Sequence, residues 1–252
     1  MVDDLELKIT HILRGHDWLP STPIHLLVFE YLDGQRPEIG HLSDILSSTT
    51  GKKLSKRRDS VFAEEFLKEG YLPEALLNFV MLLGWAPKDN RETYTLEEFV
   101  KEFDINGFQE SNPRFEDKKL KWFNGFYIRQ KTDEELLSLI KLSVPEITLE
   151  IIPLIKERIN NLNEVKGLIN FFFVRPEPMT SINMKQAHDL LKDAVWTKQG
   201  IETAIAGKDK SFYMDLRLAV CGQKITPPLT ESMLILKKDE TLARIHQSQA
   251  QG

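Results

Sequence analysis

The chain has 252 residues, of which 41% are hydrophobic and 28% are charged. This composition is that of a globular protein with a buried core, and it excludes a disordered chain. The net charge is −5, from 33 Lys and Arg against 38 Asp and Glu, which excludes a protein that coats nucleic acid through its overall charge. Local basic patches stay compatible with RNA binding, because binding follows the field at the contact surface.

Cysteine usage and hydropathy narrow the class further. A single cysteine, Cys221, excludes an intramolecular disulfide, and no Cys and His cluster has zinc-ligand spacing, so we expect no metal site and no structural zinc. The apolar neighbours at 218–220 predict that Cys221 is a buried small hydrophobic residue. The sequence contains no apolar run of 18 residues, so no membrane span is predicted. The acidic start is unlike a leader peptide. We expect a soluble cytoplasmic protein, with an organelle matrix as the alternative.

Residues 1–60 mix short apolar runs with Gly and Pro. We predict a strand over residues 9–13. Proline fits the first turn of a helix, so Pro23 is expected to open a helix that runs to Leu32 and stops at Gly34. This part of the chain should form a small α/β unit.

From about residue 61 the apolar residues recur with helical spacing. We predict a helix over residues 61–68 that ends at Gly70, since glycine commonly follows a helix end. A second helix is predicted between Pro73 and Gly84. Its expected apolar face consists of Leu76, Leu77, Val80, Met81 and Leu83.

Two capping boxes predict further helix starts. Thr95 with Glu98, and Thr132 with Glu135, place a threonine three residues before a glutamate. Pro145 should end the helix that Thr132 opens. No strong hairpin signal follows residue 60. Further helices are predicted at 148–160, 163–173, 184–197, 200–206, 211–221, 228–237 and 239–247.

The pattern as a whole predicts a mainly α protein with three parts. A small α/β piece occupies residues 1–60, a helical unit 61–130 and a second, all-helical unit 131–252. The seam between the helical units is expected near residues 129–132, where one helical pattern ends and a capping box opens another.

A basic loop at residues 51–58 reads Gly-Lys-Lys-Leu-Ser-Lys-Arg-Arg and holds five cations in eight positions. Fixed cations stabilise charge that builds on phosphates during a reaction, and a mobile loop can close over them. On charge alone a solvated charge run or generic anion patch is favoured. The loop is not a Walker loop, because the GxxxxGK[ST] spacing is absent.

Part of this loop has the sequence Lys53-Leu54-Ser55-Lys56-Arg57, which resembles the KMSKS signature of class I aminoacyl-tRNA synthetases in the form typical of glutamyl enzymes. Further blocks resemble bacterial-type glutamyl-tRNA synthetases in the same order, so the resemblance covers essentially the whole chain. They are VDD at 2–4 with ITHILRGHDWLPSTP at 9–23, GYLPEALLN and LLGW at 70–85, FEDKKLKWFNGFYIR at 115–129, and LRLAVCG with PL at 216–229.

This resemblance implies a glutamate–tRNA ligase, which uses ATP to form glutamyl-adenylate and then charges tRNA(Glu). It implies a partial Rossmann-type catalytic domain with the KMSKS-type loop at 1–60, a helical stem-contact domain at 61–130 and an anticodon-binding domain at 131–252. The implied ligands are L-glutamate, tRNA and ATP, with Mg²⁺ as the nucleotide counter-ion. No membrane partner is implied, and a monomer is expected.

The resemblance also assigns residues around ATP and glutamate. Lys53 and Lys56 would contact the ATP phosphates and act in catalysis, Ser55 would shape the loop, and Asp17 would lie near ATP. Arg14 would bind the glutamate substrate, since a guanidinium fork fits a carboxylate bidentately. A structural salt bridge at a strand end is the alternative for Arg14.

Trp18 would line the same glutamate pocket, although alone it would be read as a core residue. Near the C-terminus, Arg217, Thr226, Pro227 and Leu229 match positions that meet the anticodon loop. Unstacked loop bases expose edges to polar groups and faces to arginine planes. An ordinary helix followed by a proline-rich turn is the alternative.

The sequence departs from the family in having no HIGH motif, which grips ATP from the other half of the site. We therefore expect the isolated chain not to activate glutamate and to need an N-terminal half supplied separately. Two other functions stay open: a non-catalytic tRNA-binding module derived from the synthetase, and a helical scaffold for protein interactions. Binding of tRNA that weakens steeply with salt would exclude the scaffold.

Overall fold

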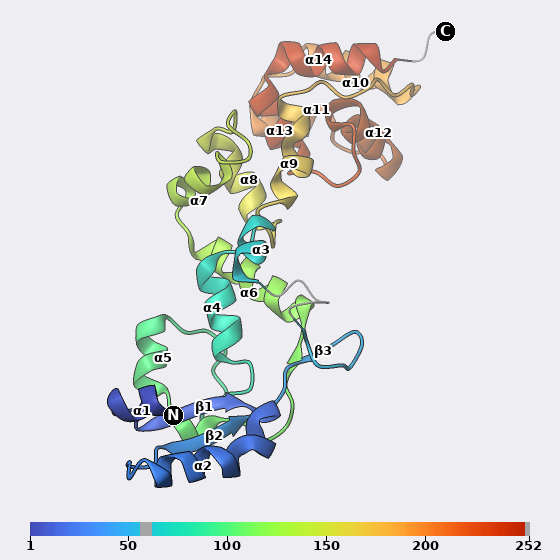
Figure 1. Ribbon diagram of the computed structural model, residues 1–252. Helices are drawn as coiled ribbons and strands as arrows, with labels where there is room; N and C mark the ends of the chain where they lie inside the picture. Colours follow the sequence, from blue (N-terminus) through green and yellow to red (C-terminus); the bar gives the residue numbers. More distant parts are fainter. Residues whose placement is uncertain (56–61, 250–252) are drawn as a thin grey trace. The chain divides into compact units, whose positions relative to one another are not determined.

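The computed structural model describes residues 1–55 and 62–249, so Lys56 lies outside the described residues. The chain divides into two units, Met1–Asn124 and Gly125–Gly252. Helices dominate both (Figure 1), which confirms the mainly α prediction. The finer division into three domains stays a prediction.

The first unit opens with α1 (Val2–Glu6), followed by β1 (His11–Gly15), which pairs in parallel with β2 (Glu38–Leu42). The connection consists of the 3-10 helix η1 (His16–Ser21) and α2 (Thr22–Tyr31). The strands lie side by side in Figure 1. The predicted strand exists but starts two residues later, and the helix expected at Pro23 is present. Open α/β sheets bind ligands at the carboxyl ends of their strands, where β1 runs into η1.

A second pair of short strands, β3 (Leu46–Ser47) and β4 (Arg114–Phe115), is also parallel. The chain after β3 folds back: Leu54 N donates to Ile45 O at 2.8 Å, and Ser47 N donates to Lys52 O at 2.8 Å. Gly51 takes φ +66° in the turn, a conformation that suits glycine. This hairpin places Lys53 opposite Leu46.

The rest of the first unit is helical, and β4 is a short exception to the helical pattern expected after residue 60. A capping box at Thr95 begins α5, as predicted. Gly70 and Gly84 take φ +88° and +91° after the ends of the two helices that precede them. The elements are α3 (Ala63–Lys68), α4 (Pro73–Met81), α5 (Leu96–Glu102), η2 (Ile105–Gly107) and α6 (Asp117–Gln130).

The predicted apolar face of α4 is wrong. Leu77 and Val80 are 41% and 51% exposed, whereas Ala75, Asn78 and Phe79 are buried. The core side of this helix contains an amide, which a count of apolar residues cannot place inside.

The second unit contains the remaining helices. The Thr132 capping box forms as predicted, and the other predicted helices are present with ends that differ by several residues. No helix in the described part of the chain is long and apolar enough to cross a bilayer. The elements are α7 (Asp133–Ile140), η3 (Leu149–Ile151), α8 (Ile152–Lys156), α9 (Glu164–Ile169), η4 (Asn170–Phe172), α10 (Asn183–Lys192), α11 (Lys198–Ala204), α12 (Lys210–Cys221), α13 (Leu229–Leu236) and α14 (Lys238–Gln247).

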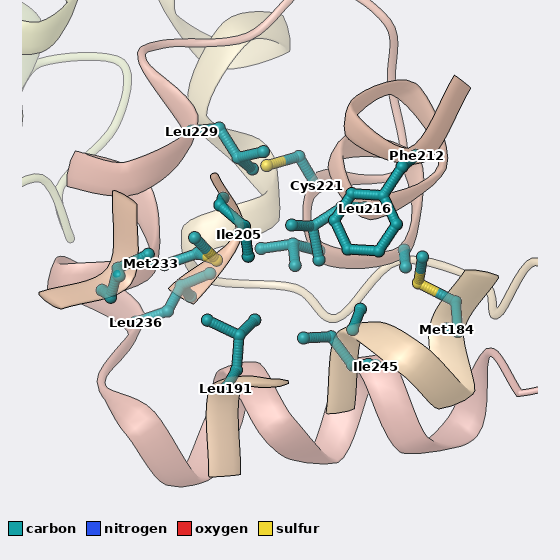
Figure 2. Packing of buried hydrophobic residues seen from close by; sticks show 14 of the residues in the cluster. Met184, Leu191, Ile205, Phe212, Leu216, Cys221, Leu229, Met233, Leu236 and Ile245 are labelled. Atoms are coloured by element: carbon teal, nitrogen blue, oxygen red, sulfur yellow. The ribbon is translucent and has the colours of Figure 1, made fainter. Parts of the chain in front are cut away.

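A hydrophobic core joins α10, α11, α12, α13 and α14 (Figure 2). Phe212, Leu216 and Met233 are almost fully buried within it. Burial of each such side chain contributes about 1.5–3 kcal/mol to the free energy of folding. Cys221 is 3% exposed, as its apolar neighbours predicted. This core fixes the end of α12 and the start of α13, and so holds both ends of the segment that carries the expected anticodon residues.

Candidate functional site

Arg14 lies near the carboxyl end of β1, with its guanidinium surrounded by hydrogen-bond partners. Nη1 lies 2.8 Å from His25 Nδ1, and Nη2 donates to Thr22 Oγ1 at 2.7 Å. Nε donates to His41 Nε2 at 3.1 Å. No ion pair of Arg14 with a carboxylate exists among the described residues, so the salt-bridge alternative does not explain its position. None of these partners is a carboxylate, so the charge of the guanidinium is available to an anion.

His41 must be neutral at Nε2 to accept from Arg14. Burial lowers the pKa of His41, and the nearby charges of Arg14 and then His16 lower it further. A neutral imidazole leaves the positive charge of the guanidinium uncompensated. The site is therefore suited to a carboxylate.

Trp18 lies on η1, and its side chain is 55% exposed, so the core alternative for this residue is wrong. Its ring centroid lies 6.2 Å from that of His25. Its carbonyl accepts from Ser21 Oγ at 2.9 Å and Thr22 Oγ1 at 3.1 Å, which closes the turn behind Arg14. The turn thus presents an exposed indole beside the arginine fork.

Lys53 lies at the base of the hairpin, and its ammonium group contacts two carboxylates. Nζ lies 2.8 Å from Asp44 Oδ1 and also forms an ion pair with Asp17 Oδ2. These hydrogen bonds, first that of Asp17 and then that of Asp44, raise the pKa of Lys53. The contact joins Lys53 to η1, the turn that carries Trp18. Ser55 is half-buried just after the hairpin.

Four residues of this site were not predicted: Thr22, His25, His41 and Asp44. Two of them depend on pairings between distant segments: His41 reaches Arg14 through the β1–β2 pairing, and Asp44 reaches Lys53 beside the hairpin. The pairing of residues that are far apart in the chain has no local sequence signal that could predict it. His11 and His16, which lie closer to Arg14 along the chain, are not among its hydrogen-bond partners.

The raised pKa keeps the Lys53 ammonium charged, and a charged ammonium is a group that commonly binds phosphates. A resident metal has no evident donor set: within the ranges 1–55 and 62–249, no group of three or more His, Cys, Asp or Glu could hold an ion.

In the second unit, Arg217 lies on α12, one turn before the helix ends. Its Nε is buried and has no hydrogen-bond partner among the described residues. A buried donor without an acceptor costs free energy, so an added acceptor there would be stabilising.

The other expected anticodon residues follow α12 but point into the fold. Thr226 is 5% exposed and donates from Oγ1 to Pro227 O at 2.7 Å, and Leu229 is 8% exposed at the start of α13. The preceding Lys224 is exposed, and Ile225 is 80% exposed. These two residues, which the sequence did not single out, form the outer surface of the segment. The buried residues can act on RNA only through their backbone or by shaping this loop.

Comparisons with known proteins match both units. Residues 1–122 match the family of tRNA synthetases class I (E and Q), catalytic domain, and residues 118–249 match the anticodon binding domain. The glutamate–tRNA ligase of Treponema denticola is 31% identical over 311 residues, covering 100% of this chain and 60% of the relative. Glutamate–tRNA ligase 1 of Fervidobacterium nodosum is 35% identical, covering 97% of this chain and 56% of the relative.

Solved structures agree with these matches. The glutamate-tRNA synthetase from Elizabethkingia anophelis superposes with a TM-score of 0.85 at 32% identity, covering 98% of this chain and 58% of that one. A glutamate tRNA ligase from Elizabethkingia meningosepticum, in complex with its amino acid, gives a TM-score of 0.85 at 31% identity. The chain spans somewhat more than half the length of these relatives. It belongs to the glutamate–tRNA ligase family of class I aminoacyl-tRNA synthetases.

Proposed function

We propose that this chain supplies one side of the ATP and glutamate site, and the anticodon-reading part, of an ATP-dependent glutamate–tRNA ligase. The observation that carries this proposal is the Lys53–Asp17 ion pair. This ion pair joins Lys53 to the turn that follows Arg14. An ammonium group suited to phosphates and a guanidinium suited to a carboxylate would therefore belong to one site.

Arg14 would orient glutamate. An incoming carboxylate would take over the donors now directed at His25 and Thr22, and the two parallel hydrogen bonds of a guanidinium would fix its direction. Fixing the amino acid beside the nucleotide lowers the entropic part of the barrier. Trp18 would form the wall of this pocket.

Lys53 would act on the phosphates. When the substrate carboxylate attacks the α-phosphate, negative charge grows on the departing pyrophosphate, and a nearby ammonium stabilises it. Lys56 would act alongside Lys53, Ser55 would shape the loop, and Asp17 would lie close to the nucleotide. Mg²⁺ bound to the nucleotide would neutralise part of the phosphate charge.

The second unit would read the anticodon through Arg217 and the segment from Thr226 to Leu229. The place of the half-buried Arg217 on α12, just before this segment, supports this role, because a guanidinium offers donors that suit the acceptors of a base edge. Pro227 and Leu229 would set the shape of the loop, and the exposed Lys224 would meet phosphate. We further propose that the protein acts as a monomer in the cytoplasm.

Titration of fluorescent tRNA(Glu) with the 252-residue chain tests this function. We expect binding that falls steeply between about 50 and 200 mM salt and that weakens when the anticodon bases are exchanged. Arg217→Gln should remove this discrimination, whereas the matched surface variant Lys224→Gln should weaken binding equally for all anticodons. Equal affinity of the unmodified chain for every anticodon would contradict anticodon reading.

The catalytic half of the proposal has a separate test. We expect no substantial glutamate-dependent exchange of ATP and pyrophosphate by the 252-residue chain alone. Addition of a HIGH-containing region from a relative should create this exchange, and Arg14→Gln should then abolish it. A non-catalytic tRNA-binding module would bind tRNA in the first test yet show no exchange in the second, whatever region is added.

A further inference from the structure

The positive charge of the Lys53 ammonium group is paired with two carboxylates in this structure. Asp44 Oδ1 lies 2.8 Å from Nζ, and Asp17 reaches the same atom from η1. The side chains of Lys53, Asp44 and Asp17 are 42%, 28% and 71% exposed, so Asp44 is the most buried member. The three charges sum to −1. Within this cluster the two carboxylates outweigh the ammonium group that a polyphosphate would bind.

The hairpin explains why Asp44 reaches Lys53. Leu46 lies opposite Lys53, and the bond from Leu54 N to Ile45 O extends this pairing beyond β3 towards Asp44. Asp44, two residues before Leu46, therefore takes the diagonal position from Lys53. Long side chains at such diagonal positions can touch. The Asp44–Lys53 contact is therefore a product of the local register.

Asp44 is itself anchored to a distant segment. Its backbone N donates to Asn112 Oδ1 at 3.0 Å, and the neighbouring Ser43 Oγ donates to Gln109 O at 3.3 Å. Leu46 N also donates to Pro113 O at 2.9 Å, just before β4. The backbone around Asp44 is thus held by hydrogen bonds to residues 109–113, whereas Lys53 lies on one strand of a hairpin.

We propose that Asp44 is a positioning residue that holds Lys53 in a stored position until a polyphosphate displaces it. This inference rests on the proposed role of Lys53 at the ATP phosphates. Phosphate binding is then an exchange: Lys53 leaves a carboxylate and meets a phosphate oxygen. The stored position lowers affinity for phosphate, and it keeps the lysine charged and close to the turn that carries Asp17 and Trp18.

Titration with inorganic triphosphate, followed by the amide NMR shifts of residues 44–55, tests the proposal on the 252-residue chain. Asp44→Asn keeps the shape and the diagonal position but removes one charge. We expect it to bind triphosphate roughly two- to fivefold more tightly, the range that a partly exposed ion pair supports. Glu6→Gln, on α1, is the matched control, because it changes the net charge equally from an exposed position.

The variants Lys53→Gln and Asp44→Asn/Lys53→Gln complete a double-mutant cycle. Lys53→Gln should weaken triphosphate binding, and Asp44→Asn should have no effect in that background. If Lys53→Gln leaves binding unchanged, the phosphate role of Lys53 fails. If Lys53→Gln weakens binding but Asp44→Asn does not strengthen it beyond Glu6→Gln, only the storage role of Asp44 fails. If no variant binds, both fail.

Discussion

Arg14 and His41 are register partners across the parallel β1–β2 pair, and Arg14 Nε donates to His41 Nε2 over 3.1 Å. Two groups that can both be cations are thus joined by a hydrogen bond that requires one of them to be neutral. Burial, Arg14 and His16 each lower the pKa of His41, which agrees with this geometry. Protonation of His41 would both break the bond and place a second cation against the guanidinium.

The first prediction concerns the pH dependence of stability. The pKa of His41 is lowered by folding, so the unfolded chain takes up a proton first as pH falls below about 6.5. The folded state should therefore lose stability as pH falls through and below this value. Urea unfolding between pH 7.5 and 5 should show a smaller loss for His41→Gln, whose amide oxygen can still accept from Arg14. His11→Gln, at an exposed position, should behave like the unmodified chain.

The second prediction concerns Arg244, whose side chain is 3% exposed in the second unit. Nη1 donates to Phe171 O at 2.8 Å and to Val220 O at 2.7 Å, while Nε donates to Glu240 at 2.7 Å. Arg244→Met leaves two carbonyls without donors and a carboxylate without its buried partner. Such losses cost about 3–5 kcal/mol of the free energy of unfolding.

Arg175→Met is the matched control for Arg244, because Arg175 contacts the same Glu240 from the surface. Exposed ion pairs contribute little, so this variant should unfold at nearly the same denaturant concentration as the unmodified chain. Equal destabilisation by the two variants would contradict a structural role for the carbonyl contacts of Arg244.

Local signals and long-range pairings explain what could be predicted. The capping boxes at Thr95 and Thr132 involve four consecutive residues each, and both were visible in the sequence. The motif around Arg14 indicated a carboxylate site, but its partners His25 and His41 depend on how α2 and β2 return to β1. Asp44 depends on the hairpin in the same way. The sequence thus predicts which side chains can bind charged ligands. Which residues these side chains contact depends on how distant segments pair.

The third prediction follows from the misplaced face of α4. Asn78 is fully buried, its Oδ1 accepts from Tyr94 N at 2.7 Å, and its Nδ2 donates to Glu92 O at 2.8 Å. Asn78→Leu should cost about 2–4 kcal/mol, because two buried backbone groups lose partners. Val80→Asn on the same helix should change stability by less than about 0.5 kcal/mol, since Val80 is half exposed. A larger cost for the Val80 variant would restore the face predicted from hydrophobicity.

The fourth prediction concerns Cys221, whose thiol is buried among apolar side chains (Figure 2). Burial raises its pKa to about 12, so the reactive thiolate is scarce at neutral pH. A disulfide reagent at pH 8 should therefore label the folded chain only as fast as it opens, and should label the urea-unfolded chain at once. Rapid labelling of the folded chain would show that the α12 end is open to solvent.

The last prediction compares two glycines with the same backbone conformation. Gly222 and Gly207 take φ +72° and +73°, in the left-handed region, where a Cβ is strained by about 1–2 kcal/mol. An added Cβ at Gly207 meets nothing within 4 Å, whereas at Gly222 it would lie 2.4 Å from Pro176 Cβ. Gly207→Ala should therefore show the backbone strain alone, and Gly222→Ala should lose clearly more stability in urea. Because Gly222 ends α12 just before Thr226, its alanine variant should also weaken tRNA binding, whereas Gly207→Ala should not. Equal costs for both alanines would mean that the segment around Pro176 moves aside without loss.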